Sequence, residues 1–80
     1  METKDLNCAA YFMAKEIKLK DCLPDQDQRF WFIFTDDDNL EVLRKEYYLN
    51  TGFVKPQDFI NAQKTLKNLI RNFKTSTKHN

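Results

Sequence analysis

The residues with the clearest chemical pattern are cations near the end of the sequence. They follow one another at steps of three, four, three and four residues: Lys64, Lys67, Arg71, Lys74 and Lys78. On a helix, at about 100° per residue, this spacing gathers the five side chains within about 80°. A one-sided row of cations is suited to contact the phosphates of a nucleic acid. It is equally compatible with an acidic protein surface as partner, or with a helix face that is merely solvated.

Residues for nucleophilic catalysis are few and badly placed. The single His, His79, and the single Ser, Ser76, both lie in the final STKHN segment, where we expect the chain end to fray. Cys8 falls in an apolar helical pattern without a His to activate it, so we expect an inert thiol. We therefore predict that the protein is not an enzyme and that it has no catalytic residues, no cofactor and no small-molecule substrate.

Two groups of aspartates are candidate ligands for a divalent cation. Asp36, Asp37 and Asp38 are consecutive, whereas Asp21, Asp25 and Asp27 surround a Pro-containing turn. Neither group has the Gly and the bidentate Glu that a calcium loop requires. Helix capping and turn formation explain both groups, so we predict no metal site.

The run RFWFIFT has a strand pattern with two apolar faces. Phe30, Phe32 and Phe34 alternate with Trp31 and Ile33. We expect the Phe face to pack on helices. Trp31 and Ile33 then need cover from another helix of this chain, from a protein partner or from a second copy in a homodimer. These two residues are the candidate partner-binding residues.

The composition indicates one small folded domain with an uneven charge distribution. The chain has 80 residues, 41% of them hydrophobic, and a formal net charge of +1. Residues 1–54 hold seven Lys/Arg against eleven Asp/Glu, while residues 55–80 hold six against one. We predict a single domain over residues 1–80, with an ordered core over 3–73 and a frayed basic tail over 74–80.

The order of local patterns predicts an α+β fold of helix, β-hairpin, helix and helix. Thr3 is expected to cap the first helix, and EIKLKDC and RFWFIFT to pair around the LPDQDQ turn. DDDN is expected to cap the second helix and Gly52 to end it in a left-handed conformation. Pro56 suits the first turn of the last helix.

The sequence predicts a cytoplasmic protein without a membrane partner. No apolar run approaches the roughly 18 residues that span a bilayer, and the METKDL start does not resemble a signal peptide.

Three segments carry a resemblance to a known family: TKDLNCAAYFMAKEIKL, FWFIF and EYYLNTGFVKPQDFINAQKTLKNLI. Over roughly residues 3–72 the chain resembles a family of small bacterial and phage-encoded proteins catalogued as a domain of unknown function. The chain departs from the family pattern at Glu16, where Gly is common, and at Lys55, where an acid is common. The resemblance implies a cytoplasmic protein from a phage or mobile-element setting, with no catalytic residues to transfer.

Taken with the charge pattern, this predicts a small non-catalytic binding protein that contacts nucleic acid through the basic row. The alternatives are a protein-binding inhibitor or adaptor that acts on host machinery, for example in counter-defence, and a homodimeric structural module. The inhibitor would use Trp31 and the acidic segment at residues 36–38.

Overall fold

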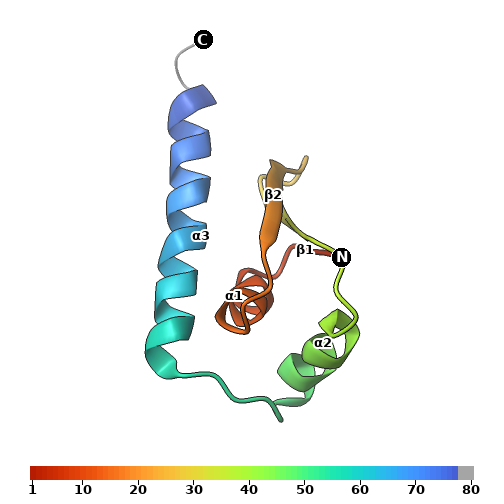
Figure 1. Cartoon of the computed structure of the whole chain (residues 1–80). Coiled ribbons are helices and arrows are strands. Elements are labelled where there is room, and N and C mark those ends of the chain that lie inside the picture. Colours follow the sequence, from red (N-terminus) through yellow and green to blue (C-terminus); the bar gives the residue numbers. More distant parts are fainter. Residues whose placement is uncertain (78–80) are drawn as a thin grey trace.

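The fold is a small antiparallel sheet with helices packed on one of its faces (Figure 1). A computed structural model describes residues 1–77, with side chains through Thr75. Its elements follow in the order β1 (Glu2–Thr3), α1 (Leu6–Ala14), β2 (Leu19–Pro24), β3 (Phe30–Phe34), α2 (Leu40–Leu49) and α3 (Pro56–Thr77). This confirms the predicted α+β class and the order of helix, hairpin, helix and helix.

The sheet has three strands in the order β1-β3-β2, with both pairs antiparallel. The predicted hairpin is β2 and β3, in which Leu23 lies opposite Trp31. The short strand β1 was not predicted, because two residues carry no alternation signal. Thr3 belongs to this strand, and its predicted role as the cap of α1 is wrong. The side chain of Asp5 caps α1 instead, accepting from the backbone N–H groups of Asn7 and Cys8.

The inner face of the sheet forms the core together with α1 and α3. Phe30, Phe32 and Phe34 are buried, as the alternation in β3 predicts. The ring of Phe12 on α1 meets Phe34 edge-on, with 5.2 Å between the ring centroids. The ring of Phe73 on α3 meets Phe30 in the same way at 5.4 Å. Both helices are therefore anchored to the same face of β3.

Helix α2 begins directly after DDDN as predicted, but its N-terminal capping and its end differ from the sequence prediction. Its N-cap, Asn39, makes no side-chain capping bond, and Asp37 accepts from the Asn39 backbone N–H in a turn before the helix. The helix ends at Asn50, which takes the left-handed conformation with φ 58°. The predicted left-handed stop at Gly52 is wrong, because Gly52 has no positive φ. Asn is the residue after Gly that best tolerates this conformation.

Helix α3 starts at Pro56 as predicted and is the longest element, with 22 residues. It runs beyond residue 73, the predicted end of the ordered core, and continues to Thr77. Lys74 is therefore helical, whereas Lys78 and His79 lie outside the described residues. Within residues 1–77, no helix combines the length and the apolar character that crossing a bilayer requires.

Candidate nucleic-acid interface

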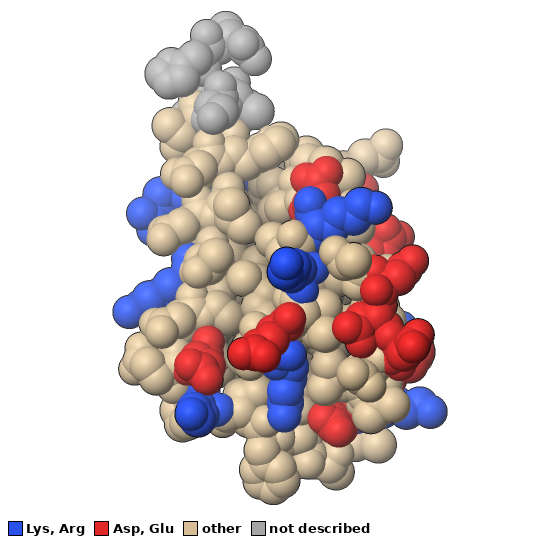
Figure 2. Space-filling view, in the orientation of Figure 1, with Lys and Arg blue, Asp and Glu red and all other residues tan. Residues whose placement is uncertain are grey.

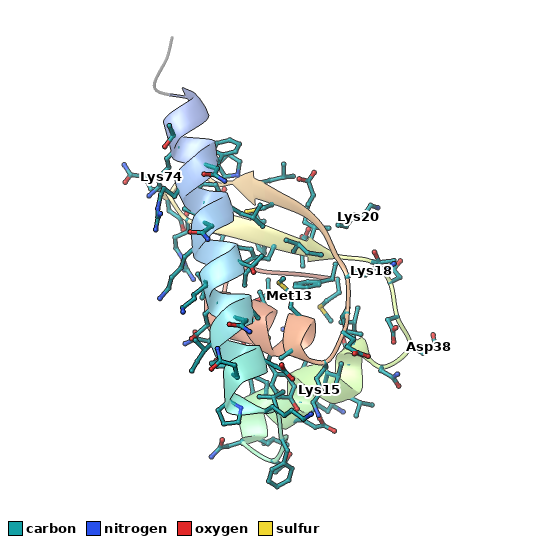
Figure 3. The ribbon with its side chains drawn as sticks, turned by 60° about the vertical axis from the view of Figure 1, so that its left-hand side comes forward. Met13, Lys15, Lys18, Lys20, Asp38 and Lys74 are labelled. Atoms are coloured by element: carbon teal, nitrogen blue, oxygen red, sulfur yellow. The ribbon has the colours of Figure 1, made fainter. Side chains whose placement is uncertain are left out.

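Helix α3 presents its cations on the side opposite the core. Ala62 and Leu66 are buried, and their side of the helix packs against α1 and the sheet. The cations are all exposed: Lys64, Lys67, Arg71 and Lys74. Their row is centred about 130° around the helix from the apolar stripe. We call these four residues the basic row, and Figure 3 shows Lys74 pointing away from the sheet.

Few acids lie near the basic row. Among the residues that the structure describes, no ion pair joins Lys64, Lys67 or Arg71 to a carboxylate. The one acid of α3, Asp58, is in its first turn. Figure 2 shows Lys and Arg side chains along the outer edge of α3 and a gathering of acidic side chains on the opposite edge of the molecule. Asp38 lies on that far side from Lys74 (Figure 3).

Polar side chains flank the basic row on α3. Asn61, Asn68 and Asn72 are exposed, and Asn61 is engaged by a hydrogen bond from Gln57. Asn72 also lines a groove of about 440 Å³ between α3 and β2. The remaining lining residues are Leu19, Lys20, Asp21, Cys22, Leu69 and Phe73. Exposed amides beside cations can donate to phosphate oxygens or to base edges.

The predicted partner-binding residues lie on the outer face of the sheet, which none of the helices described within residues 1–77 covers (Figure 1). Trp31 and Ile33 are half-buried, and their cross-strand neighbour Leu23 is 44% exposed. Part of the cover over Trp31 comes from Lys4, whose Nζ lies 5.0 Å from the ring centroid. A cation above an indole face is held by the charge distribution of the ring.

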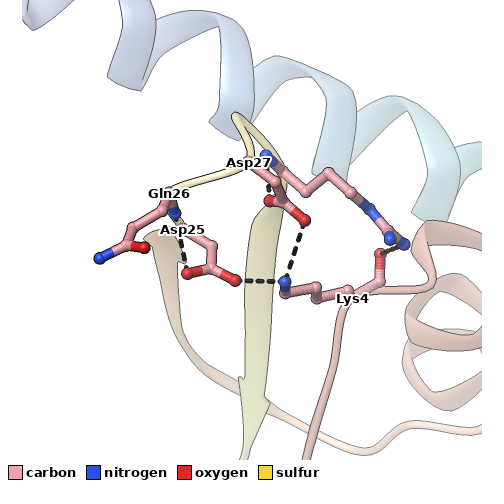
Figure 4. A network of polar contacts seen from close by, with 5 residues as sticks. Lys4, Asp25, Gln26 and Asp27 are labelled. Carbon is pink, nitrogen blue, oxygen red and sulfur yellow. Dashed lines mark hydrogen bonds and ion pairs between the residues drawn. The ribbon is translucent and has the colours of Figure 1, made fainter.

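Two of the aspartates considered as metal ligands converge on Lys4 (Figure 4). Lys4 Nζ forms ion pairs with Asp25 and with Asp27, the latter at 3.1 Å. The hydrogen bond from Lys4 lowers the pKa of Asp25. The backbone N–H of Arg29, followed by Lys4, lowers the pKa of Asp27. The two carboxylates in turn raise the pKa of Lys4. This local network positions the turn between β2 and β3.

Other metal or thiol chemistry finds little support in the described part of the chain. Within it, no group of three or more His, Cys, Asp or Glu residues is arranged to hold a metal ion. Cys8 is a buried free thiol and Cys22 a half-buried one. Burial raises the pKa of both thiols, which disfavours the reactive thiolate.

Sequence reasoning missed three exposed apolar side chains on α2 and in the loop after it. Val42, Leu49 and Phe53 are 56%, 70% and 85% exposed. The sequence contains GFVK at this point, and no periodic pattern tells which of Phe53 and Val54 points inward. The available signal in the sequence was the neighbouring Gly52. Here this residue marks a site where the side chain of Tyr11 approaches the backbone closely, and not the end of a helix.

The comparisons with known proteins give a family but no activity. Over residues 1–72 the sequence matches a family described as a domain of unknown function (DUF5659), and the chain belongs to this family. The matched range includes Lys64, Lys67 and Arg71. The search of curated proteins and the search of solved structures each found no match.

Proposed function

We propose that this protein is a small non-catalytic binding protein that contacts nucleic acid through the basic row. The observation that carries the proposal is the one-sided placement of Lys64, Lys67 and Arg71, exposed and without carboxylate partners among the described residues. Phosphates need several cations on one side without competing acids. The proposed setting, a phage or mobile element in a bacterial cytoplasm, follows from the family resemblance.

The reach of the basic row suits a nucleic-acid backbone. From Lys64 to Lys74 the row extends over about 15 Å of helix at 1.5 Å per residue. Each cation that meets a duplex phosphate lowers the slope of log affinity against log salt by about 0.9. Contact by all four predicts a slope of about −3.6 for duplex DNA and about −2.8 for a single strand.

The test is fluorescence anisotropy with labelled duplex DNA, single-stranded DNA and RNA over a salt series. In the variant Lys67→Glu/Arg71→Glu we expect weaker binding to every nucleic acid. We also expect the slope of log affinity against log salt to be less steep, by the amount that corresponds to about two lost phosphate contacts. The matched control is Arg44→Glu/Lys45→Glu. It makes the same change in net charge at exposed positions of α2, a different helix from the one that bears the basic row.

Two results would refute the proposal. One is the absence of binding by the unmodified protein at low salt. The other is an equal loss of affinity in both double variants, because that would indicate net charge rather than the row as the determinant.

A second candidate function is a protein-binding inhibitor or adaptor that uses the outer face of the sheet. The observation that favours it is that Trp31 and its cross-strand neighbour Leu23 lie on a sheet face that no helix within residues 1–77 covers. Trp31→Ala that keeps the fold but loses a purified host partner would support this function. If the protein forms a homodimer through the same face, light scattering should give the mass of a dimer. The variant Trp31→Ala should then give the mass of a monomer.

A further inference from the structure

Phe53 is the most exposed of the large apolar side chains that the structure describes, at 85%. An aromatic ring that is this exposed contributes almost no burial energy to the folded monomer, so the stability of the monomer does not explain why it is there. Phe53 lies in the segment between α2 and α3, and its backbone neighbours fix where it points. An exposed ring in a fixed position is a feature of binding surfaces.

In the segment from Gly52 to Lys55, successive residues face the protein and the solvent in turn. Gly52 lies against the hydroxyl end of the Tyr11 side chain, and Val54 packs against the core. Phe53 and Lys55, which alternate with them, are both exposed. The Lys55 carbonyl accepts from the Phe59 N–H at 3.1 Å, so Lys55 directly precedes the first turn of α3. Phe53 is therefore fixed at the N-terminal end of the helix that bears the basic row.

The combination of an exposed ring, an adjacent cation and a cationic helix suits a nucleic acid with unpaired bases. In a duplex the base faces are already stacked, whereas a single strand offers each base face to an aromatic side chain. From Pro56 to Lys74 the helix extends over about 27 Å, a length that a strand of several nucleotides can follow. Lys55 adds a cation two residues along the chain from Phe53. At about 100° per residue it lies on a different side of the helix axis from the basic row, so the strand passes around the N-terminal end of α3 to reach the ring.

We propose that Phe53 stacks on an unpaired base of a single-stranded nucleic acid whose backbone follows the basic row. This inference rests on the proposed function and specifies its ligand class as single-stranded rather than duplex. Lys55 contacts the phosphate next to the stacked base. The ring supplies preference for single strands, and the row supplies affinity that is independent of sequence.

The experiment compares binding of a labelled single-stranded oligonucleotide and of its duplex at one salt concentration. Phe53→Ala is expected to weaken single-strand binding about 5- to 100-fold, the range for loss of one base–aromatic stack. Duplex binding is expected to stay within about twofold, and the salt slope to stay unchanged because no phosphate contact is lost. Phe53→Tyr should keep the single-strand affinity, whereas Phe53→Leu, which is apolar without a ring, should lose it.

The outcomes separate this inference from the proposed function. If Lys67→Glu/Arg71→Glu abolishes binding but Phe53→Ala does not weaken single-strand binding, the inference is wrong and the proposed function stands. If Phe53→Leu binds as tightly as the unmodified protein, stacking is also refuted. If sedimentation shows a dimer that Phe53→Ala converts to a monomer, the ring is a contact between copies and the inference is overturned. Circular dichroism of each variant confirms that it is folded.

Discussion

Replacing Gly52 with Ala should destabilise the protein although the backbone there suits any residue. Gly52 has no positive φ, so the substitution introduces no backbone strain. The added Cβ would lie 2.7 Å from Tyr11 Cζ and closer still to its hydroxyl oxygen. Tyr11 is only 5% exposed, and its hydroxyl donates to Glu46 Oε1 at 2.9 Å. Moving the ring away from the added Cβ would therefore disturb this hydrogen bond and the packing of a buried side chain.

The expected cost follows from these contacts. Overpacking a close-packed site costs about 1–3 kcal/mol. Displacing the Tyr11 hydroxyl from a carboxylate costs about 1.5–3 kcal/mol. The smaller entropy of an unfolded chain with Ala returns about 0.4–1 kcal/mol. The net loss is about 1.5–5.5 kcal/mol, a large fraction of the stability of a domain of this size.

The measurement is urea unfolding followed by circular dichroism, with the free energy of unfolding extrapolated to water. The matched control is Thr51→Ala at the adjacent exposed position, which should stay within about 0.5 kcal/mol of the unmodified protein. In a Tyr11→Phe background the cost of Gly52→Ala should fall by about 1 kcal/mol or more, because the hydroxyl is gone. If Gly52→Ala is as stable as Thr51→Ala, the reasoning is refuted.

Three further predictions concern local contacts. Glu16 has φ 69°, so Glu16→Gly should raise the free energy of unfolding by about 0.5–1 kcal/mol while Glu16→Ala should not. Asp5→Ala removes the cap of α1 and should cost about 1–2 kcal/mol in urea unfolding, most of which Asp5→Asn should retain. Burial and the hydrogen bond to Glu46 raise the pKa of Tyr11 to about 12. The stability that the protonated Tyr11 hydroxyl contributes is therefore complete below about pH 10 and is lost as the pH rises through about 12. Over that range the free energy of unfolding of Tyr11→Phe should fall less steeply with pH than that of the unmodified protein. Identical alkaline unfolding curves would contradict this prediction.

The long and periodic elements could be predicted from the sequence because their signals repeat. In β3 the alternation of Phe30, Phe32 and Phe34 with Trp31 and Ile33 defines two faces, and the structure buries the first. In α3 the spacing of Ala62, Leu66 and Phe73 fixes the buried side, and the exposed position of the cations follows from the same spacing.

The short features could not be predicted because competing residues were close in sequence and tertiary contacts decided between them. Thr3 and Asp5 are both good capping residues, but Thr3 lies in strand β1, where it pairs with Phe32. Asn50 and Gly52 can each end a helix. The structure needs a Gly at residue 52 for a different reason, because Tyr11 from α1 occupies the space that a side chain there would need.

The candidate site was predictable in its placement but not in its surroundings. The outward direction of the basic row follows from helix geometry alone. The cover of Trp31 by Lys4 depends on a contact between residues far apart in sequence, which no local pattern encodes. The exposure of Phe53 likewise depends on the fit between Gly52 and Tyr11, and the sequence alone leaves Phe53 and Val54 equivalent.

The case for a functional basic row rests on the acids that α3 lacks. A solvated helix face is stabilised by about 0.2–0.5 kcal/mol for each acid placed three or four residues from a cation. The residues four positions before the cations of the basic row are Ile60, Gln63, Lys67 and Ile70, and none of them is acidic. The row instead places like charges three or four residues apart, which destabilises a helix by similar amounts. Solubility explains the presence of cations on this face but not the exclusion of acids from it. Binding to a polyanion explains both, because each acid in the row would repel the ligand that the cations attract.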